Sequence, residues 1–292
     1  MKDAARLLAF AVATVLFGAL LAPPLFWVAQ DLTARGHLPF LAQFGFETYF
    51  HRALLLAAVL FMWPLLRSLR ATSRHDLLLE PNRRAVRDTF LGFGISAVPL
   101  LCFAVVLLAL GIYGFRAAGI GAVLPRWTAA VIVPLIEEPL FRGLLLGVLL
   151  RACSPVAAMS ISSAIYSILH FLKPSDETPT VITWTSGFGS LARSFAQFTD
   201  PLLVLAGFTT LFLLGWILAD ARIRTRSLWL PIGLHAGWIF VSATFNKMAH
   251  RELLALPWIG QNLLIGIAPL GVALLSWALL RAWLRHVQPN ES

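Results

Sequence analysis

Charged residues are scarce in this chain. Asp, Glu, Lys and Arg make up 13% of its 292 residues, about half of the roughly 25% that is usual in soluble globular domains. Hydrophobic residues make up 59%. So few charges on so apolar a chain exclude an ordinary soluble domain, and they indicate that lipid surrounds most of the protein.

Cysteine and acidic residues are also few. The two cysteines, Cys102 and Cys153, lie in or at the edge of apolar segments without a metal-type spacing, so a disulfide framework is not expected. Fourteen acidic residues against 23 Lys and Arg leave a net charge of +9. The basic residues are spread over short loops rather than gathered on one face, so membrane topology explains them better than a nucleic-acid partner does.

Long apolar runs predict an all-α, polytopic transmembrane helical bundle that forms a single integral membrane domain over 1–292. A spanning helix needs roughly 20 mostly apolar residues. Backbone groups cannot stay unpaired in hydrocarbon, and these runs are too long for barrel strands. Eight runs qualify, at about 7–30, 48–66, 89–115, 127–149, 155–173, 201–220, 227–246 and 260–284. The first follows Lys2 and Arg6 but is too long for a signal peptide, so we interpret it as an uncleaved span.

The distribution of arginine predicts the orientation of these spans. Because cytoplasmic loops are enriched in Lys and Arg, the basic loop at 67–88 is expected to be cytoplasmic. It carries Arg67, Arg70, Arg74, Arg83, Arg84 and Arg87. With eight spans both termini lie on one side, so the prediction is N-in and C-in.

The segment 174–200 is too polar to span a membrane, although large apolar side chains recur in it at helical spacing. They are Trp184, Phe188, Leu191, Phe195 and Phe198. Two interpretations stay open. The segment is either an amphipathic helix that lies flat on the extracytoplasmic membrane surface, or a structured loop that packs on the bundle.

Three ionisable residues fall within the fourth predicted span. Such side chains are costly in a membrane and usually face a polar cavity or one another. Glu138 and Arg142 are four residues apart, share a helix face and can form a charge-assisted pair. Glu137 is rotated about 100° away and lacks that partner. This division predicts that Glu138 and Arg142 stabilise and orient a site, while Glu137 is free to act as a general base.

The residues that follow the carboxylates favour an irregular helix. Pro139 removes a backbone donor and crowds the carbonyl of Leu135, which predicts a kink with room for water. Gly143 and Gly147 allow close helix contact. The same three charges also fit a buried structural network or a gated transport path.

Two histidines also fall inside predicted spans. His170 follows Tyr166 by one turn near the end of the fifth span, and His235 lies in the seventh span beside two small residues. A single buried histidine is more often a hydrogen-bonded core residue than a catalytic one. Two of them, together with a Glu-Glu pair, favour a chemical site.

These motifs occur in the order seen in the CPBP family, which includes the type II CAAX prenyl endopeptidases and bacteriocin-processing or self-immunity proteins. The family signature is Glu-Glu-x-x-x-Arg, aromatic-x-x-x-His and His-x-x-x-Asn. Here the first motif is residues 137–142, and the second runs from Tyr166 to His170. The third begins at His235 but has Ile239 in place of Asn. The chain resembles this family over roughly 127–245.

The resemblance implies an intramembrane endopeptidase in a bacterial-type cytoplasmic membrane, with a membrane-associated protein or peptide as its substrate. Glu137 and His170 would activate a water molecule, and His235 with the missing Asn would steady the oxyanion. Loss of one oxyanion donor lowers a rate by about 10²- to 10³-fold. The substrate itself does not follow from the resemblance, and prenyl processing is not implied.

The cofactor and two other functions stay open. Members of the family have been described both as metalloproteases and as metal-free glutamate proteases. The carboxylates and imidazoles include zinc ligand types, but the compact HExxH spacing is absent, so a metal-free mechanism is preferred and zinc is not excluded. The alternatives are a non-catalytic binding or bacteriocin-immunity protein, which Ile239 favours, and a proton-coupled transporter, which the lack of paired half-helix repeats disfavours.

Overall fold

The computed structural model describes residues 2–70, 73, 75–171, 181–199, 201–253, 257–260 and 262–287. Almost all of them are helical, and they form two compact units. The first unit combines Met1–Ser73 with Phe171–Thr199, and the second combines Arg74–His170 with Asp200–Ser292.

The first unit is built from two long helices and a shorter one. Helix α1 (Lys2–Ala34) packs along α2 (Phe46–Ser68), and η1 (Pro39–Gln43) lies between them in sequence. Small residues permit the close approach, because a Cβ added at Gly18 would lie 2.9 Å from the Cα of Leu54. Helix α7 (Ser186–Ala196) packs on both long helices and is followed by η4 (Gln197–Thr199).

Helix α7 covers part of the segment 174–200 and contacts its neighbours through polar and apolar side chains, since Phe188 and Leu191 pack against the buried cluster of α1 and α2. Ser186, Ser190 and Ser194 are buried, whereas Trp184 and Phe195 are exposed. Residues 174–180 lie outside the described residues. The described part is therefore a helix packed on α1 and α2, and its extracytoplasmic placement stays a prediction.

A partly buried ion pair fixes α7 to α2. The carboxylate of Glu47 accepts hydrogen bonds from Ser190 Oγ at 2.8 Å and from Arg193 Nη2 at 2.7 Å. Because an unpaired buried charge is strongly unfavourable, this contact explains how α7 can turn its polar face toward apolar helices.

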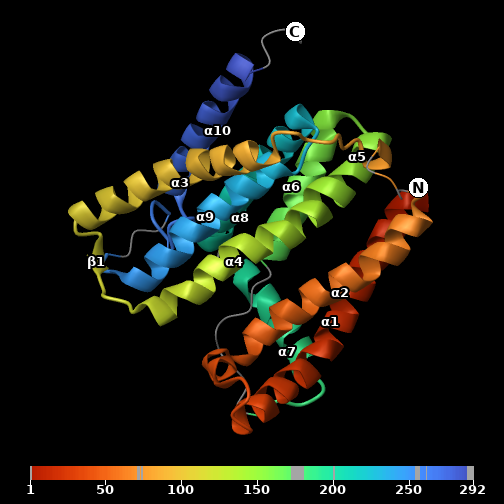
Figure 1. The fold of residues 1–292 in the computed structure, drawn as a ribbon. Coiled ribbons are helices and arrows are strands. Elements are labelled where there is room, and N and C mark those ends of the chain that lie inside the picture. Colours follow the sequence, from red (N-terminus) through yellow and green to blue (C-terminus); the bar gives the residue numbers. More distant parts are fainter. Residues whose placement is uncertain are drawn as a thin grey trace. The chain divides into compact units, whose positions relative to one another are not determined.

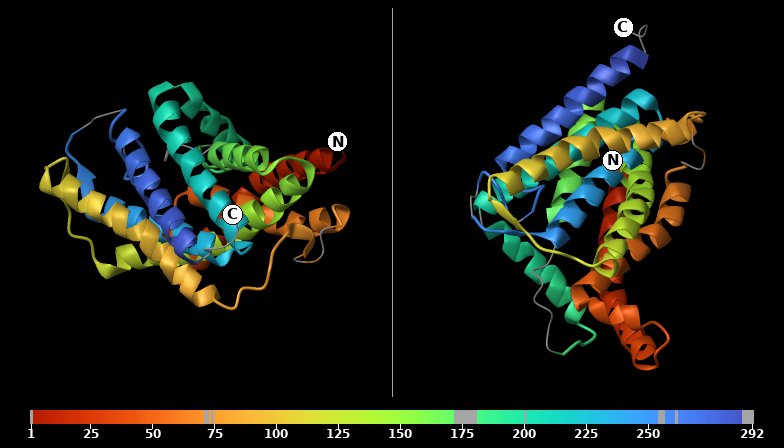
Figure 2. Two further views of the ribbon diagram at one scale, coloured as in Figure 1. Left: turned by 90° about the horizontal axis from the view of Figure 1, so that it is seen from above. Right: turned by 60° about the vertical axis from the view of Figure 1, so that its left-hand side comes forward.

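The second unit holds the remaining elements (Figure 1). They are η2 (His75–Leu77), α3 (Ala85–Ala109), β1 (Tyr113–Phe115), α4 (Ile120–Glu138), η3 (Pro139–Leu145), α5 (Leu146–Ala152), α6 (Pro155–Phe171), α8 (Pro201–Thr225), α9 (Trp229–Met248), β2 (Ala249–Arg251) and α10 (Ile267–Val287). Helix α9 is central, since it packs against α3, α4 and α8. Figure 2 shows α10 beside α3, which it also contacts.

Glycines bring α3 and α9 into close contact. A Cβ added at Gly233 would lie 2.0 Å from the carbonyl oxygen of Thr89, and one at Gly237 would lie 2.1 Å from Ser96 Oγ. No side chain fits into so little space, so the two backbones meet directly. His235 lies between these two glycines in sequence, and the contact therefore fixes the depth and rotation of this histidine.

The all-α, polytopic membrane architecture agrees with the sequence prediction. Not all eight predicted spans correspond to a helix that is long and apolar enough to cross a membrane. Among the described residues, five helices are long and apolar enough to cross a membrane, and α6 is a shorter apolar helix. The five are Ala5–Ala34, Phe46–Ser68, Ala85–Ala109, Val204–Thr225 and Ile267–His286. The count of eight spans and the N-in, C-in orientation therefore stay predictions.

Three predicted boundaries are corrected. The run 89–115 is not one helix: α3 ends at Ala109, and Tyr113–Phe115 forms β1, which pairs antiparallel with β2. The run 260–284 contains irregular backbone before α10 begins at Ile267. The run 127–149 begins earlier, at Ile120, and changes helix type within the span. Apolar composition alone did not reveal these changes, because strand, turn and helix in these runs are equally apolar.

Candidate functional site

The five side chains singled out from the sequence converge in the second unit. Glu137 and Glu138 end α4, Arg142 lies in η3, His170 lies in the last turn of α6 and His235 lies in α9. Four of them are at most 8% exposed, and the His170 side chain is 28% exposed. Segments far apart in the chain thus bring carboxylates, imidazoles and a guanidinium together inside an apolar unit.

The carboxylates stand directly before a π-helical segment. Helix α4 passes into η3 at Pro139, and η3 runs to Leu145 as a π-helix. Proline lacks the N–H group that an α-helix would need here, so the wider turn accommodates the missing bond. Short π segments inside α-helices are frequent at functional sites. The sequence predicted a kink at Pro139, and the structure shows a wider turn there.

Gly143 and Gly147 do not mediate close contact between spanning helices. A Cβ at Gly143 would make only an ordinary contact, at 3.6 Å, with Leu228 Cδ1. At Gly147 the nearest atom is the carbonyl oxygen of Leu77 in η2, at 3.1 Å. Glycines of other helices, among them Gly233 and Gly237 of α9, bring helix backbones together instead.

Glu138 is the centre of a buried network. Its Oε1 accepts a hydrogen bond from Arg142 Nη1 at 3.1 Å and lies 2.7 Å from His235 Nδ1. Glu138 is 0% and Arg142 1% exposed. With Glu138 ionised, His235 Nδ1 donates to it, so its other ring nitrogen, Nε2, is directed away from Glu138. Glu138 therefore fixes the orientation of both the guanidinium and the imidazole.

Glu137 faces both histidines. Its Oε2 lies 3.2 Å from His170 Nε2 and 3.9 Å from His235 Nε2. His170 Nδ1 lies 3.0 Å from the backbone oxygen of Tyr166, so Nδ1 carries a proton. A favourable contact between Nε2 and Glu137 then requires one further proton, on either the imidazole or the carboxyl group. Glu137 and His170 thus form a pair that can hold and exchange one proton.

Aromatic rings enclose the charged groups. The Tyr166 ring lies 4.3 Å from the guanidinium carbon of Arg142 and 4.0 Å from the His170 ring, both measured to its centroid. Phe141 packs against Tyr166 edge-on at 5.2 Å. Tyr166 therefore holds Arg142 by a cation–π contact and supports His170 on the same ring.

Sequence reasoning missed Arg222, which lies under the π-helical segment. Its Nε donates to the backbone oxygen of Arg142 at 3.0 Å, and its Nη2 donates to the backbone oxygen of Leu77. Arg222 is 1% exposed. The sixth run was predicted to end near 220, which left Arg222 outside a span, whereas α8 extends to Thr225. An arginine close to a span boundary does not reveal from sequence which way it points.

Ile239 brings no polar side chain to the position one turn after His235. It is partly buried on α9. Ser242 does not replace it, because its hydroxyl donates to the backbone oxygen of Trp238 at 2.7 Å. The departure from the family motif therefore leaves an apolar side chain beside the predicted oxyanion position.

The donor groups were also tested as a metal site. Within the described ranges, no set of three or more His, Cys, Asp or Glu side chains is arranged to hold a metal ion. Glu138 Oε1 and His235 Nδ1 are already engaged with each other, and Arg142 adds a positive charge to the same carboxylate. This arrangement does not fit a resident metal, so no chemical step is derived through one.

Comparison with known proteins identifies the segment that carries this site. Residues 119–241 match the family model for type II CAAX prenyl endopeptidase Rce1-like proteins. No curated protein and no solved structure matches the chain. The matched segment runs from the start of α4 into α9 and contains all five residues of the site, and it covers less than half of the chain.

Proposed function

We propose that this chain, whose residues 119–241 match the Rce1-like family model, is a CPBP-type intramembrane protease and hydrolyses a peptide bond of a membrane-associated protein or peptide. One observation supports the proposal most directly. Glu137 lies within 4 Å of two imidazoles while its neighbour Glu138 is held by Arg142. The site thus has one carboxylate that is positioned by partners and one that is available for proton transfer.

Glu137 and His170 are the proposed water-activating pair. Hydrolysis requires a base to take a proton from water as the oxygen attacks the peptide carbonyl, and the same proton can then pass to the leaving amine. Glu137 Oε2 lies 3.2 Å from His170 Nε2. In the form that accepts a proton, Glu137 is ionised and His170 carries the proton of the pair on Nε2, so the proton from water goes to the carboxylate and from there to the leaving amine. Burial of the pair limits competition from bulk water.

His235 is proposed to stabilise the oxyanion of the tetrahedral intermediate. Its Nδ1 is held by Glu138, so donation from Nε2 to the oxyanion uses the imidazolium form of His235. Arg142 keeps Glu138 in place and does not itself need to contact the substrate. In the family motif an Asn supplies a second donor, and Ile239 cannot donate.

The protein is proposed to work in a bacterial-type cytoplasmic membrane, as an eight-span bundle with both termini and the loop 67–88 on the cytoplasmic side. The arginines of that loop support this orientation. The substrate is proposed to be membrane-associated because the five site residues lie in or beside apolar helices.

Comparison of peptide termini in membrane proteomes with and without the intact protein tests the activity. Peptide termini that appear only when the protein is present and that disappear when Glu137 is replaced support the proposed activity. Identical sets of termini with and without the protein contradict it.

The substitution Ile239→Asn is expected to raise kcat. Asn at this position, one turn after His235, would add a donor aimed at the developing negative charge. Because the new contact forms mainly in the transition state, KM should change little. The rise is expected to be about 10- to 100-fold, below the full 10²–10³ for an optimally placed donor. Both constants are measured on one peptide substrate in liposomes.

The matched control for this experiment is Ile239→Leu, which keeps the position apolar. It should leave kcat at the parental value. An Asn variant that melts like the parent but shows no gain in kcat would contradict the oxyanion assignment. It would leave two explanations, another donor already in place or a protein that binds its client without cutting it.

Hydrolysis is proposed to proceed without a metal ion. Treatment with EDTA or 1,10-phenanthroline, followed by gel filtration, should leave the rate unchanged, while a zinc metalloprotease treated in parallel loses its activity. Metal analysis of the active protein should give much less than one equivalent of zinc. A rate lost on chelation and restored by zinc would contradict the metal-free mechanism but not the proposed protease function.

A further inference from the structure

A surface cavity lies outside the site described above, where the start of α3 meets the ends of α8 and α10. Its volume is about 380 Å³, within the range of small-ligand pockets. The lining includes Arg83, Arg84 and Arg87 from the α3 side and Trp283 from α10. Three arginines in one cavity are unfavourable by mutual repulsion, so the charge balance of the lining decides what the cavity can bind.

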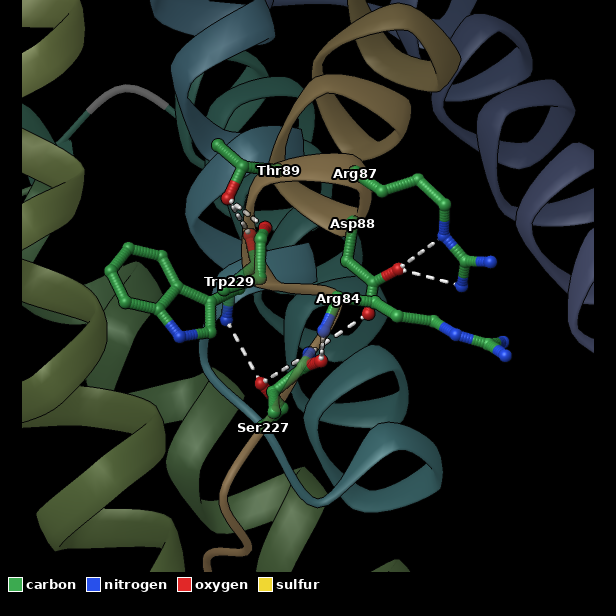
Figure 3. Close-up of polar contacts among 8 residues, drawn as sticks. Arg84, Arg87, Asp88, Thr89, Ser227 and Trp229 are labelled. Carbon is green, nitrogen blue, oxygen red and sulfur yellow. Dashed lines mark hydrogen bonds and ion pairs between the residues drawn. The ribbon is translucent and has the colours of Figure 1, made fainter.

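The two carboxylates of the cavity are already neutralised. Glu80 pairs with Arg226 at 2.6 Å, and the buried Asp88 accepts from Arg87 at 2.9 Å. Figure 3 shows Arg84 and Arg87 extending to the same side of α3, with Asp88 beside them. Among the described residues no carboxylate pairs with the side chains of Arg83 or Arg84. The cavity therefore keeps an excess of positive charge.

Trp283 and Arg87 line the cavity with side chains that are common where a membrane meets water. The Arg87 guanidinium lies 5.6 Å from the Trp283 ring centroid. Tryptophan and arginine are typical of the headgroup level of a membrane. Immediately along the same helices, exposed apolar side chains continue toward the hydrocarbon: Val86 and Phe90 on α3 are 70% and 73% exposed, and Leu279 on α10 is 43% exposed.

We infer that this cavity binds the phosphate-bearing headgroup of an anionic phospholipid. The guanidinium groups of Arg83 and Arg84 would pair with phosphate oxygens. The acyl chains would lie over the exposed apolar residues of α3 and α10. A free phosphate ion shares the headgroup chemistry, but it makes no use of the apolar surface that begins at the rim of the cavity.

The lipid also fits the orientation predicted from the sequence. Arg83, Arg84 and Arg87 of the cavity belong to the basic loop 67–88, which is predicted to be cytoplasmic. Basic pockets between transmembrane helices on that side bind lipid headgroups of negative charge. Bound lipid would add a second link between α3 and α10 at the end where Arg87 contacts Trp283.

The test compares one double variant and one single variant with the parent protein. Purified protein in nonionic detergent is titrated with dioleoylphosphatidylglycerol, dioleoylphosphatidylcholine or inorganic phosphate, and bound lipid is counted by native mass spectrometry. We expect phosphatidylglycerol to bind better than phosphatidylcholine. The variant R83Q/R84Q should weaken phosphatidylglycerol binding by about tenfold or more, since each arginine contributes about fivefold near anionic lipid. Both residues are exposed, so the fold should be retained.

The control variant is R285Q, which removes an exposed arginine at the same end of α10 that does not line the cavity. It should bind phosphatidylglycerol like the parent. Equal binding by R83Q/R84Q and the parent would overturn the inference. So would equal weakening by R285Q, which would indicate a diffuse basic surface. Displacement of the lipid by an equal concentration of inorganic phosphate would assign the cavity to the free ion and overturn the lipid proposal.

Discussion

The variant Glu137→Gln is expected to have no detectable peptidase activity and to fold like the parent. The amide keeps the shape of the side chain but cannot accept the proton from water, and loss of a general base lowers a rate by about 10²- to 10⁴-fold. The buried ion pair joins Arg142 to Glu138. Replacing Glu137 by Gln therefore leaves this pair intact. Rate and melting temperature are measured on the same preparation.

The control for this variant is Glu252→Gln, which neutralises a glutamate whose side chain is 52% exposed and lies outside the site. It should cleave at the parental rate. If the purified Glu137 variant also cleaved at that rate, Glu137 would not be the base. A large fall in melting temperature for Glu137→Gln would assign this residue a structural role instead.

The variant Glu138→Gln is expected to be strongly destabilised as well as inactive. Glu138 is fully buried and contacts Arg142 and His235 through one carboxylate oxygen. Neutralising it leaves the Arg142 guanidinium buried without a counter-charge, and breaking such a pair costs about 3–5 kcal/mol. The measurement is the free energy of unfolding in detergent, compared with that of Glu137→Gln.

A double variant separates the ion pair from simple packing. Removing both charges, in Glu138→Gln with Arg142→Met, should recover part of the stability lost in the single variant, because no unpaired charge remains. It should not recover activity, since His235 still lacks the carboxylate that orients it. A double variant no more stable than Glu138→Gln would show that the pair contributes little to the fold.

The residues that make up the site were easier to predict from the sequence than the boundaries of the helices that carry them. The spacing of four between Glu138 and Arg142 predicted their pairing, because residues at that spacing share a helix face. The structure shows this pair at 3.1 Å, even though η3 is π-helical where Arg142 lies. Motif order and a shared expectation of burial also grouped His170 and His235 with Glu137.

Contacts between distant segments could not be predicted in the same way. Nothing in the spacing of Arg222 indicates that its side chain reaches the backbone of Arg142, and nothing in Glu47 indicates its pairing with Arg193. Such contacts depend on which helix lies beside which, and one sequence does not determine that. Strand β1 was missed because its residues continue the apolar run 89–115, and β2 has only three residues, of which two are His and Arg.

The π-helical turn also changes how the two ends of its span relate to each other. One extra residue per turn rotates everything after it by about 100° relative to a regular α-helix. Glu137 and Glu138 can therefore face the histidines while α5 buries a different angular face, with Leu146 fully buried against the Ala158–Met159 cluster. The π-helical turn thus sets the direction of the carboxylates at the end of α4 separately from that of the α5 side chains, so the same span can face the histidines before the turn and pack against α6 after it.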